Sequence, residues 1–435
     1  MKNVLVIGSG AREVAISRKI SESKVEHALF CVSLEKNPQI ESLCSDYLVC
    51  PLSQIKTICD YALLKKIDLV FIGPENPLAG GVVNELEAVG VSCVGPRKEV
   101  AMIETSKSFA RDIIASCAPE KNPKKRSFKS LSGVENFINE LNREYVIKYD
   151  GLMGGKGVKI SGEHLPSIND GLKYAQSLVN MGGSFLVEEK LVGEEFSLMS
   201  FVDGKTCCHM PIVQDHKRAF EGDVGPNTGG MGTYSFANHS LPFLKNREVL
   251  DAQKTNELVA KQLLKETGVP FVGILYGGFM LTKKGVKVIE YNARLGDPEA
   301  MNVLSLMKTD FLRVCDQIIS GSLSKNSVVF EALSTVCKYA VPTGYPNKPA
   351  KGFVIDCKIE DLDVYLASVK SVGGQVVACG SRAVAVIGKN KDVFVAEKFV
   401  ERKISSVGGD LYHRKDIGTK ELISRRVGRM EKILR

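Results

Sequence analysis

Residues 146–158, VIKYDGLMGGKGV, join two short apolar segments through a loop with four glycines and a lysine. We expect a strand, a glycine loop and a second strand over 145–160. A P-loop would need Ser or Thr after its Gly-Lys pair and a helix after the loop, and neither is present. The loop is therefore either a flap whose amides, at Gly154 and Gly155, and Lys156 cover a polyphosphate, or a glycine-rich hairpin with a solvated lysine.

The first hundred residues alternate short apolar runs with helical patterns. This alternation indicates a parallel sheet covered by helices on both faces. The expected strands are Asn3–Ile7, Ala28–Val32, Asp68–Ile72 and Val91–Val94, and the expected helices lie near 12–22, 54–66 and 79–89. We interpret residues 1–102 as one doubly wound α/β domain.

The remaining chain has a different pattern of elements. Residues 103–325 mix helices, strands and long glycine-rich loops, which indicates an α+β domain with functional loops. From 326 to 435 short strands return, followed by a helix near 391–404, and we expect a small C-terminal α+β domain. The fold class is thus a multidomain combination of α/β and α+β.

Composition excludes several classes of protein. Of 435 residues, 44% are hydrophobic and 25% are charged, as in ordinary globular enzymes. Twelve cysteines without a CxxC pair, and apolar runs too short for a membrane helix, favour a reducing cytoplasm. The net charge of +8 suits anionic small substrates as well as nucleic acid, and no nucleic-acid-binding motif is present. Part of this charge lies in Arg425, Arg426, Arg429 and Arg435, which we expect on a solvated helix face.

Three loops follow predicted parallel strands, at the sheet edge where ligands bind in such folds. They are GSGARE (8–13), GPENP (73–77) and Gly95-Pro96. The first offers helix N-terminal amides, which suit phosphate. A dinucleotide fingerprint would place glycine at position 13, where this chain has Glu13. A nicotinamide site is therefore disfavoured, and a simple tight turn explains the loop as well as a ligand does.

Two further segments carry polar groups in unusual density. Residues 188–191 end an apolar strand and could offer backbone groups to adenine, with a carboxylate at 193–195 for a ribose; ordinary surface charge is the alternative. Residues 214–232 place acid, base and amide side chains among five glycines. A linker would not need that mixture, so we expect a substrate loop.

Residues 290–299, EYNARLGDPE, provide the strongest signal. On a strand, Glu290, Asn292 and Arg294 point to one face. A carboxylate beside an amide oxygen suits Mg²⁺, and an arginine fork suits phosphate or carboxylate. Burying these three without a ligand would be costly.

In their order along the chain, these motifs resemble the ATP-grasp superfamily and, within it, the glycinamide ribonucleotide synthetase family. The resemblance spans nearly the whole chain. The matching stretches are GSGARE (8–13), GPENPL (73–78), SKSFARD (106–112), VIKYDGLMGGKGV (146–158), VEEKLVGEEFS (187–197), QDHKR (214–218), GPNTGGMGTYS (225–235), IEYNARLGDPE (289–299) and YHRKDIG (412–418).

The resemblance implies that ATP phosphorylates glycine to glycyl phosphate, which the amine of 5-phosphoribosylamine then attacks. It implies an ATP-grasp domain at 103–325 with a lid at about 120–188. It also implies small-molecule partners only, without nucleic acid or membrane, in a monomer or homodimer.

The resemblance assigns residues to roles. Mg²⁺ or Mn²⁺ would bind Glu290 and Asn292. Arg294 would stabilise the charge on the transferred phosphoryl group, and Asp215 and Asp297 are the two candidates for the proton acceptor. The substrate residues would be Gly10, Glu75, Lys217, Arg218, Asn227 and Glu299. The ATP-binding residues would be Lys107, Lys148, Gly154, Gly155, Lys156, Glu188, Glu189, Lys190, Leu191 and Glu195.

The sequence departs from the family pattern at a few positions. Ala11 and Val14 replace a glycine and a histidine of the first loop, and Met153 and Gly154 replace two alanines of the flap. Two alternatives therefore stay open: an ATP-grasp ligase that uses a different amine, and a non-catalytic ATP-binding homologue. The second would be expected to have lost Lys148 or Glu290, which are present.

Overall fold

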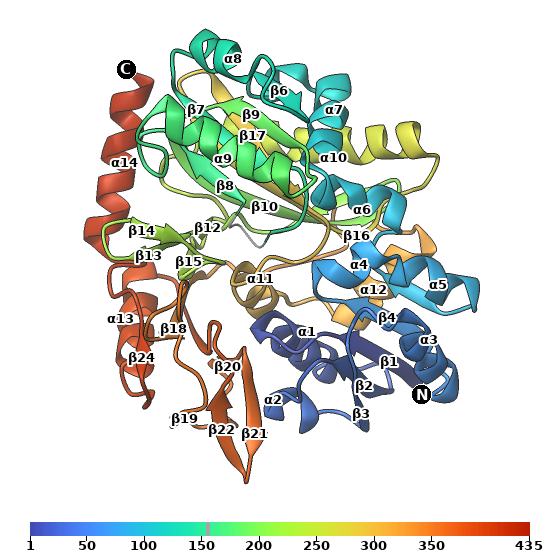
Figure 1. Ribbon diagram of the computed structural model, residues 1–435. Coiled ribbons are helices and arrows are strands. Elements are labelled where there is room, and N and C mark those ends of the chain that lie inside the picture. The colour runs from blue at the N-terminus through green and yellow to red at the C-terminus, as the bar shows by residue number, and fades with distance from the viewer. Residues whose placement is uncertain (154–156) are drawn as a thin grey trace.

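The computed structural model describes residues 1–153 and 157–435. Four larger bodies are visible in Figure 1: an N-terminal sheet with its helices, a central sheet, a lid above it and a C-terminal body. Within the described ranges, no helix is both long enough and apolar enough to cross a membrane.

The N-terminal strands form one parallel sheet in the order β3-β2-β1-β4-β5, which confirms the doubly wound prediction. The strands are β1 Lys2–Ile7, β2 His27–Ser33, β3 Asp46–Val49, β4 Leu69–Ile72 and β5 Ser92–Val94. The helices are α1 Ala11–Ser21, α2 Pro38–Glu41, α3 Ile55–Leu64, α4 Glu75–Gly80, α5 Val82–Ala88 and α6 Lys98–Thr105.

Two details of this region differ from the prediction. The edge strand β3 was not expected, because it is short and only partly buried, and so lacks a continuous apolar run. The helix expected at 79–89 is two helices, α4 and α5. Gly81 separates them with a left-handed φ of 87°, which glycine adopts without steric cost.

The central sheet is antiparallel, in the order β11-β10-β16-β17. Its strands are β10 Gly193–Asp203, β11 Cys207–His209, β16 Val272–Thr282 and β17 Gly285–Asn292. The helices around it are α7 Lys107–Cys117, α10 Asn246–Thr267, α11 Glu299–Leu306 and α12 Phe311–Ser320.

The lid is a second antiparallel sheet, in the order β6-β9-β7-β8. Its elements, with the short 3₁₀ turn η1 Pro119–Lys121 before them, are β6 Lys125–Phe128, α8 Val134–Glu140, β7 Tyr145–Tyr149, β8 Val158–Ile160, α9 Ile168–Asn180 and β9 Phe185–Glu189. Its apolar side chains form a separate core around Phe128, Phe137 and Phe185. The lid therefore keeps its own packing apart from the rest of the protein.

The C-terminal sheet takes strands from two distant parts of the chain. Its order is β12-β15-β18-β23-β20, and β24 also pairs with β18. The strands are β12 Gln214–Asp215, β15 Gly232–Ser235, β18 Ser334–Pro342, β20 Val364–Leu366, β23 Val384–Asn390 and β24 Leu411–Tyr412. Because β12 and β15 belong to the predicted substrate loop, that loop is held by the C-terminal body.

Smaller elements complete this body. A hairpin joins β13 Arg218–Phe220 to β14 Val224–Asn227, and a three-stranded sheet has the order β19-β22-β21. The remaining elements are β19 Val354–Ile355, β21 Val369–Val372, β22 Gln375–Ala378, α13 Val393–Ile404 and α14 Lys420–Leu434.

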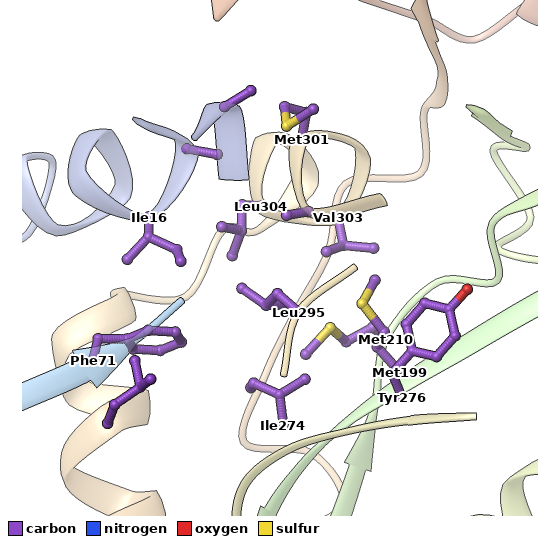
Figure 2. Packing of buried hydrophobic residues seen from close by; sticks show 14 of the residues in the cluster. Ile16, Phe71, Met199, Met210, Ile274, Tyr276, Leu295, Met301, Val303 and Leu304 are labelled. Atoms are coloured by element: carbon purple, nitrogen blue, oxygen red, sulfur yellow. The ribbon is translucent and has the colours of Figure 1, made fainter. Parts of the chain in front are cut away.

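One hydrophobic core continues from the N-terminal sheet through the central sheet into the C-terminal body. Figure 2 shows the junction, where Ile16 of α1 and Phe71 of β4 face Leu304 of α11. Leu295 lies between them and the side chains of the central sheet, such as Ile274. The loop that carries the predicted site residues is thus anchored by its own apolar side chain.

Replacing Leu304 by Ala should lower the free energy of unfolding by about 2–5 kcal/mol, because the side chain is 2% exposed and its loss leaves a cavity. The matched control is Leu64→Ala, at a leucine that is 74% exposed, with an expected change within about 0.5 kcal/mol. Urea unfolding of both variants measures this, and equal effects would contradict the shared core.

Candidate active site

Three charged clusters meet where the central sheet, the lid and the N-terminal loops adjoin. In the first, Glu290 of β17 lies 3.3 Å from Nζ of Lys217, which is 3.8 Å from Glu195. Lys217, with help from Lys148 and Lys107, lowers the pKa of Glu290 to about 2 against the effect of burial. Glu290 is therefore ionised, and three lysines surround one carboxylate.

The side-chain oxygens of Glu290 and Asn292 are suitable ligands for a divalent cation that phosphate oxygens also bind. Asn292 follows on the same face of β17. Its Oδ1 accepts a single long hydrogen bond, 3.4 Å, from NH2 of Arg294. No group of three or more carboxylate, imidazole or thiolate residues that could hold a metal occurs in the described ranges. A cation at Glu290 and Asn292 would therefore need nucleotide and water oxygens, as Mg²⁺ commonly does.

The second cluster joins the lid to the central sheet. Glu188 of β9 accepts two hydrogen bonds from Arg111 of α7, at 2.6 and 2.8 Å, and lies 2.8 Å from Lys148 of β7. Burial would raise the pKa of Glu188, but Arg111 and Lys148 outweigh it and lower that pKa to about 2. Burial lowers the pKa of Lys148, and Glu188 limits the fall. The side chain of Glu188 is thus fully engaged, and its backbone lies in register with Lys125 of β6 and Val146 of β7.

The predicted adenine segment crosses from the lid to the central sheet. Lys190 N–H donates to the carbonyl of Glu144, and its Nζ donates to the carbonyl of Ser161. Glu189 accepts from the N–H of Lys124, whereas Leu191 is partly exposed before β10 begins. These contacts hold the segment in an extended path between two sheets.

The start of the predicted flap is tied to the first turn of α7. Lys107 Nζ donates to the carbonyl of Gly151 at 2.8 Å, and Asp150 accepts from the N–H of Ser108 at 3.1 Å. The predicted phosphate-binding residues Gly154, Gly155 and Lys156 lie outside the described residues.

Arg294 is the centre of the third cluster. Its guanidinium lies 3.0 Å from Glu104 of α6, and its Nε lies 3.6 Å from Glu75 of α4. This buried Nε has no hydrogen-bond partner in the part of the chain that the structure describes. Glu104 also accepts from the N–H of Ala293 at 2.7 Å, so it positions both the side chain and the backbone of this loop. Arg294 thus keeps one buried donor for a ligand.

Glu13 explains why the first loop does not match a dinucleotide site. Its carboxylate accepts from the N–H of Gly10 at 2.6 Å and pairs with Arg12, also at 2.6 Å. A Cβ at Gly73 would lie only 2.0 Å from Glu13 Oε1, so the carboxylate fills the hollow between the two loops. Ala11 and Val14, the residues that depart from the family pattern, are both buried.

Asp297 is held by two residues of the C-terminal body. Tyr339 O–H donates to its Oδ1 at 2.6 Å, and Arg382 NH2 lies 3.3 Å from the same oxygen. Arg382 also donates to the carbonyls of Gly229, Gly230 and Asp297. The structure therefore joins two motif loops, 225–232 and 296–299, through one arginine that the sequence did not single out.

Asp215 lies in a different environment from Asp297. Burial, together with the nearby Glu299, raises its pKa well above the usual range. Glu299 in turn accepts a hydrogen bond of 2.8 Å from Tyr276 O–H. A carboxylate with a raised pKa is a stronger base than an ordinary aspartate.

Two predicted substrate residues lie apart from these clusters. Arg218 pairs with Glu163 of the lid, and its NH1 donates to the carbonyl of Gly225. Asn227 is its partner in the β13–β14 hairpin. In this structure Arg218 therefore links the hairpin to the lid, and neither residue joins the carboxylate group around Asp215.

Comparisons with known proteins agree along the whole chain. Family models described as phosphoribosylglycinamide synthetase match in three parts: the N domain at residues 2–104, the ATP-grasp (A) domain at 105–300 and the C domain at 335–420. The phosphoribosylamine–glycine ligase of Methanococcoides burtonii is 46% identical over 434 residues, covering 100% of both chains. That of Methanocaldococcus jannaschii is 43% identical over 444 residues, covering 99% of this chain and 100% of the relative.

Solved structures show the same relationship. The phosphoribosylamine–glycine ligase of Thermotoga maritima superposes with a TM-score of 0.80 at 26% identity, covering 95% of this chain and 100% of that one. A biotin carboxylase of Campylobacter jejuni shares the fold at 14% identity, with a TM-score of 0.74 and 98% and 96% coverage. From its sequence, its fold and its charged clusters, this chain belongs to the phosphoribosylglycinamide synthetase family of ATP-grasp enzymes.

Proposed function

We propose that this protein is a ligase that uses ATP to join glycine to 5-phosphoribosylamine, giving glycinamide ribonucleotide, ADP and phosphate. The observation that carries the proposal is Glu290 beside Asn292 on β17, with Lys217, Lys148 and Lys107 near the Glu290 carboxylate and Arg294 in the bend that follows the strand. Phosphoryl transfer needs this kind of positioning and charge neutralisation more than it needs a protein nucleophile.

We assign the ATP site to the boundary between lid and central sheet. Lys107 and Lys148 would bind phosphate oxygens, with Gly154, Gly155 and Lys156 closing over them. The segment Glu188–Leu191 would bind adenine through its backbone, and Glu195 would bind the ribose. A pair of Glu290 and Asn292 would hold Mg²⁺ or Mn²⁺, which neutralises phosphate charge when bound.

Arg294 would stabilise the negative charge that develops as glycine becomes glycyl phosphate. Its Nε supports this role, because Glu104 holds NH2 at 3.0 Å while Nε lies 3.6 Å from Glu75 and makes no hydrogen bond within the described residues. Enclosure by the lid would keep water away from an acyl phosphate that hydrolyses readily.

Asp215 is the better of the two candidates for accepting the proton of the attacking amine. Its pKa is raised toward the range in which a carboxylate is an effective base, whereas Asp297 is occupied by Tyr339 and Arg382. Asp297 would instead orient substrate, together with Gly10, Glu75, Lys217 and Glu299. Arg218 and Asn227 would approach substrate from the hairpin.

Other assignments belong to the same proposal. The domains would be 1–102, 103–325 with a lid at about 120–188, and 326–435. The protein would act in the cytoplasm, as a monomer or homodimer, on small molecules and not on nucleic acid.

The first test is ADP release from ATP and Mg²⁺, with glycine and fresh 5-phosphoribosylamine each added or omitted. We expect turnover only with both, and glycinamide ribonucleotide as product. Tight binding of MgATP without turnover would instead favour a different amine substrate or a non-catalytic homologue, with the 8–14 loop as the first place to look.

Replacing Arg294 by Lys should lower kcat by about 10²–10³-fold, since the lysine keeps the charge but loses the fork of donors. The matched control is Arg247→Lys, at a side chain that is 76% exposed in α10, and its kcat should stay close to wild type. Steady-state kinetics on both variants measures this, and a near-normal kcat in R294K would remove Arg294 from the mechanism.

Replacing Asp215 by Asn should lower kcat by about 10²–10⁴-fold, yet stabilise the fold near neutral pH. The raised pKa means that the folded state binds this proton more tightly than the unfolded state, whose Asp pKa is about 3.9. The free energy of unfolding of the wild type therefore falls as the pH rises from about 3.9 through the higher pKa of Asp215 in the folded state. The D215N variant should not show this fall. Unfolding midpoints across pH measure the difference, and parallel curves would contradict it.

A further inference from the structure

The C-terminal helix α14 does not lie on the surface as a simple solvated helix. It leaves the C-terminal body and contacts β10 and β16, the two inner strands of the central sheet (Figure 1). Of its arginines, Arg425 and Arg429 are 52% and 58% exposed at the side chain, whereas Arg426 is only 12% exposed. The sequence-based expectation of a solvated arginine face is therefore wrong for Arg426, because the helix packs that side chain inward.

Arg426 joins two carboxylates that are far apart in sequence. Its NH1 donates to Glu194 Oε2 at 2.7 Å, and its NH2 donates to Asp223 Oδ2 at 2.9 Å. Glu194 is 2% exposed at its side chain, so this carboxylate needs a cation. The planar fork of the guanidinium presents separate donors, NH1 and NH2, to the two carboxylates.

Each carboxylate belongs to an element that carries predicted ligand-binding residues. Glu194 lies in β10 next to Glu195, and successive strand residues point to opposite faces, so Glu195 faces Lys217 while Glu194 faces α14. Asp223 lies at the tip of the β13–β14 hairpin, whose strands carry Arg218 and Asn227.

A second arginine fixes the hairpin to the C-terminal body. Arg414 lies 2.9 Å from Asp223 Oδ1, and its NH1 donates to the carbonyl of Arg218 at 3.0 Å. The hairpin thus has its own anchor without Arg426. What Arg426 adds is the connection from the hairpin to the strand on the nucleotide side.

We propose that Arg426 is a positioning residue that sets the ribose-side strand β10 and the substrate hairpin 218–227 at a fixed separation. The proposal rests on the proposed function for the identity of the two ligands. Without the bridge, both elements keep their folds and the contacts of Lys217 and Gln214 with Glu195, but the tip of the hairpin loses its link to β10. ATP and the second substrate should then be affected together, and misplacement of this kind lowers kcat on the order of tenfold to a hundredfold.

The test compares variants of α14 in the full-length protein. Arg426→Met removes the bridge, and Arg426→Lys keeps a charge that reaches one carboxylate. Arg425→Gln and Arg429→Gln are matched controls, because each touches only one of the carboxylates, at 3.4 Å from Asp223 and 3.3 Å from Glu194. We expect R426M and R426K to raise KM for both ATP and 5-phosphoribosylamine and to lower kcat, with both controls close to wild type.

Hydrogen exchange provides a readout that needs no turnover. In R426M, exchange should accelerate in residues 190–197 and 218–227 but not in the N-terminal sheet. If wild type itself fails to turn over, the proposed function fails, while exchange and MgATP affinity still test the bridge. The proposal is overturned if R426M matches the two controls, or if its only change is a lower melting temperature with unchanged KM values and exchange in both segments.

Discussion

The pairing of Glu188 with Arg111 and Lys148 is the interaction on which the arrangement of the site depends. Each of these three side chains is nearly inaccessible to water, and each comes from a different element, β9, α7 and β7. Removing Glu188 would leave two buried cations without their shared counterion, and an uncompensated buried charge costs several kcal/mol. Arg111 also donates to the carbonyls of Val288 and Ile289, directly before Glu290. One buried carboxylate therefore sets the lid, Lys148 and the segment that leads into Glu290 in register.

The two hydrophobic cores do not follow the order of the bodies along the chain. The lid has its own core, whereas the N-terminal, central and C-terminal bodies share one. A body with a separate core can tilt against its neighbours without exposing apolar side chains. The contacts that fix it are polar, through Glu188 and through the Arg218–Glu163 pair, and such contacts can be exchanged for contacts with a ligand. The substrate loop, in contrast, is built into the C-terminal sheet through β12 and β15.

Local pattern was sufficient for much of the fold. Apolar runs in the sequence located β1, β2, β4 and β5. The glycine loop, with strands expected on both sides of it, excluded a P-loop. The pattern failed where burial was incomplete, as in β3, or where one glycine changed the backbone direction, as at Gly81. Alternation placed Glu290 and Asn292 on one face of a strand, because strand periodicity is a local property, but the prediction was wrong for Arg294, which lies in a bend after β17 ends at Asn292.

The sequence by itself determined the family and the chemical groups available, since motif order and strand alternation are written in consecutive residues. Only the tertiary structure decided how those groups are held. Glu104, Tyr339, Arg382 and Arg426 act on residues that lie between 42 and 232 positions away, and nothing in their local sequence marks them. It also decided that the side chain of Glu188 is engaged by Arg111 and Lys148 and that Arg426 is largely buried. The physical reason is that the charge state and the partner of a buried ion depend on what the fold places within a few ångströms of it, and that is set by packing rather than by sequence spacing.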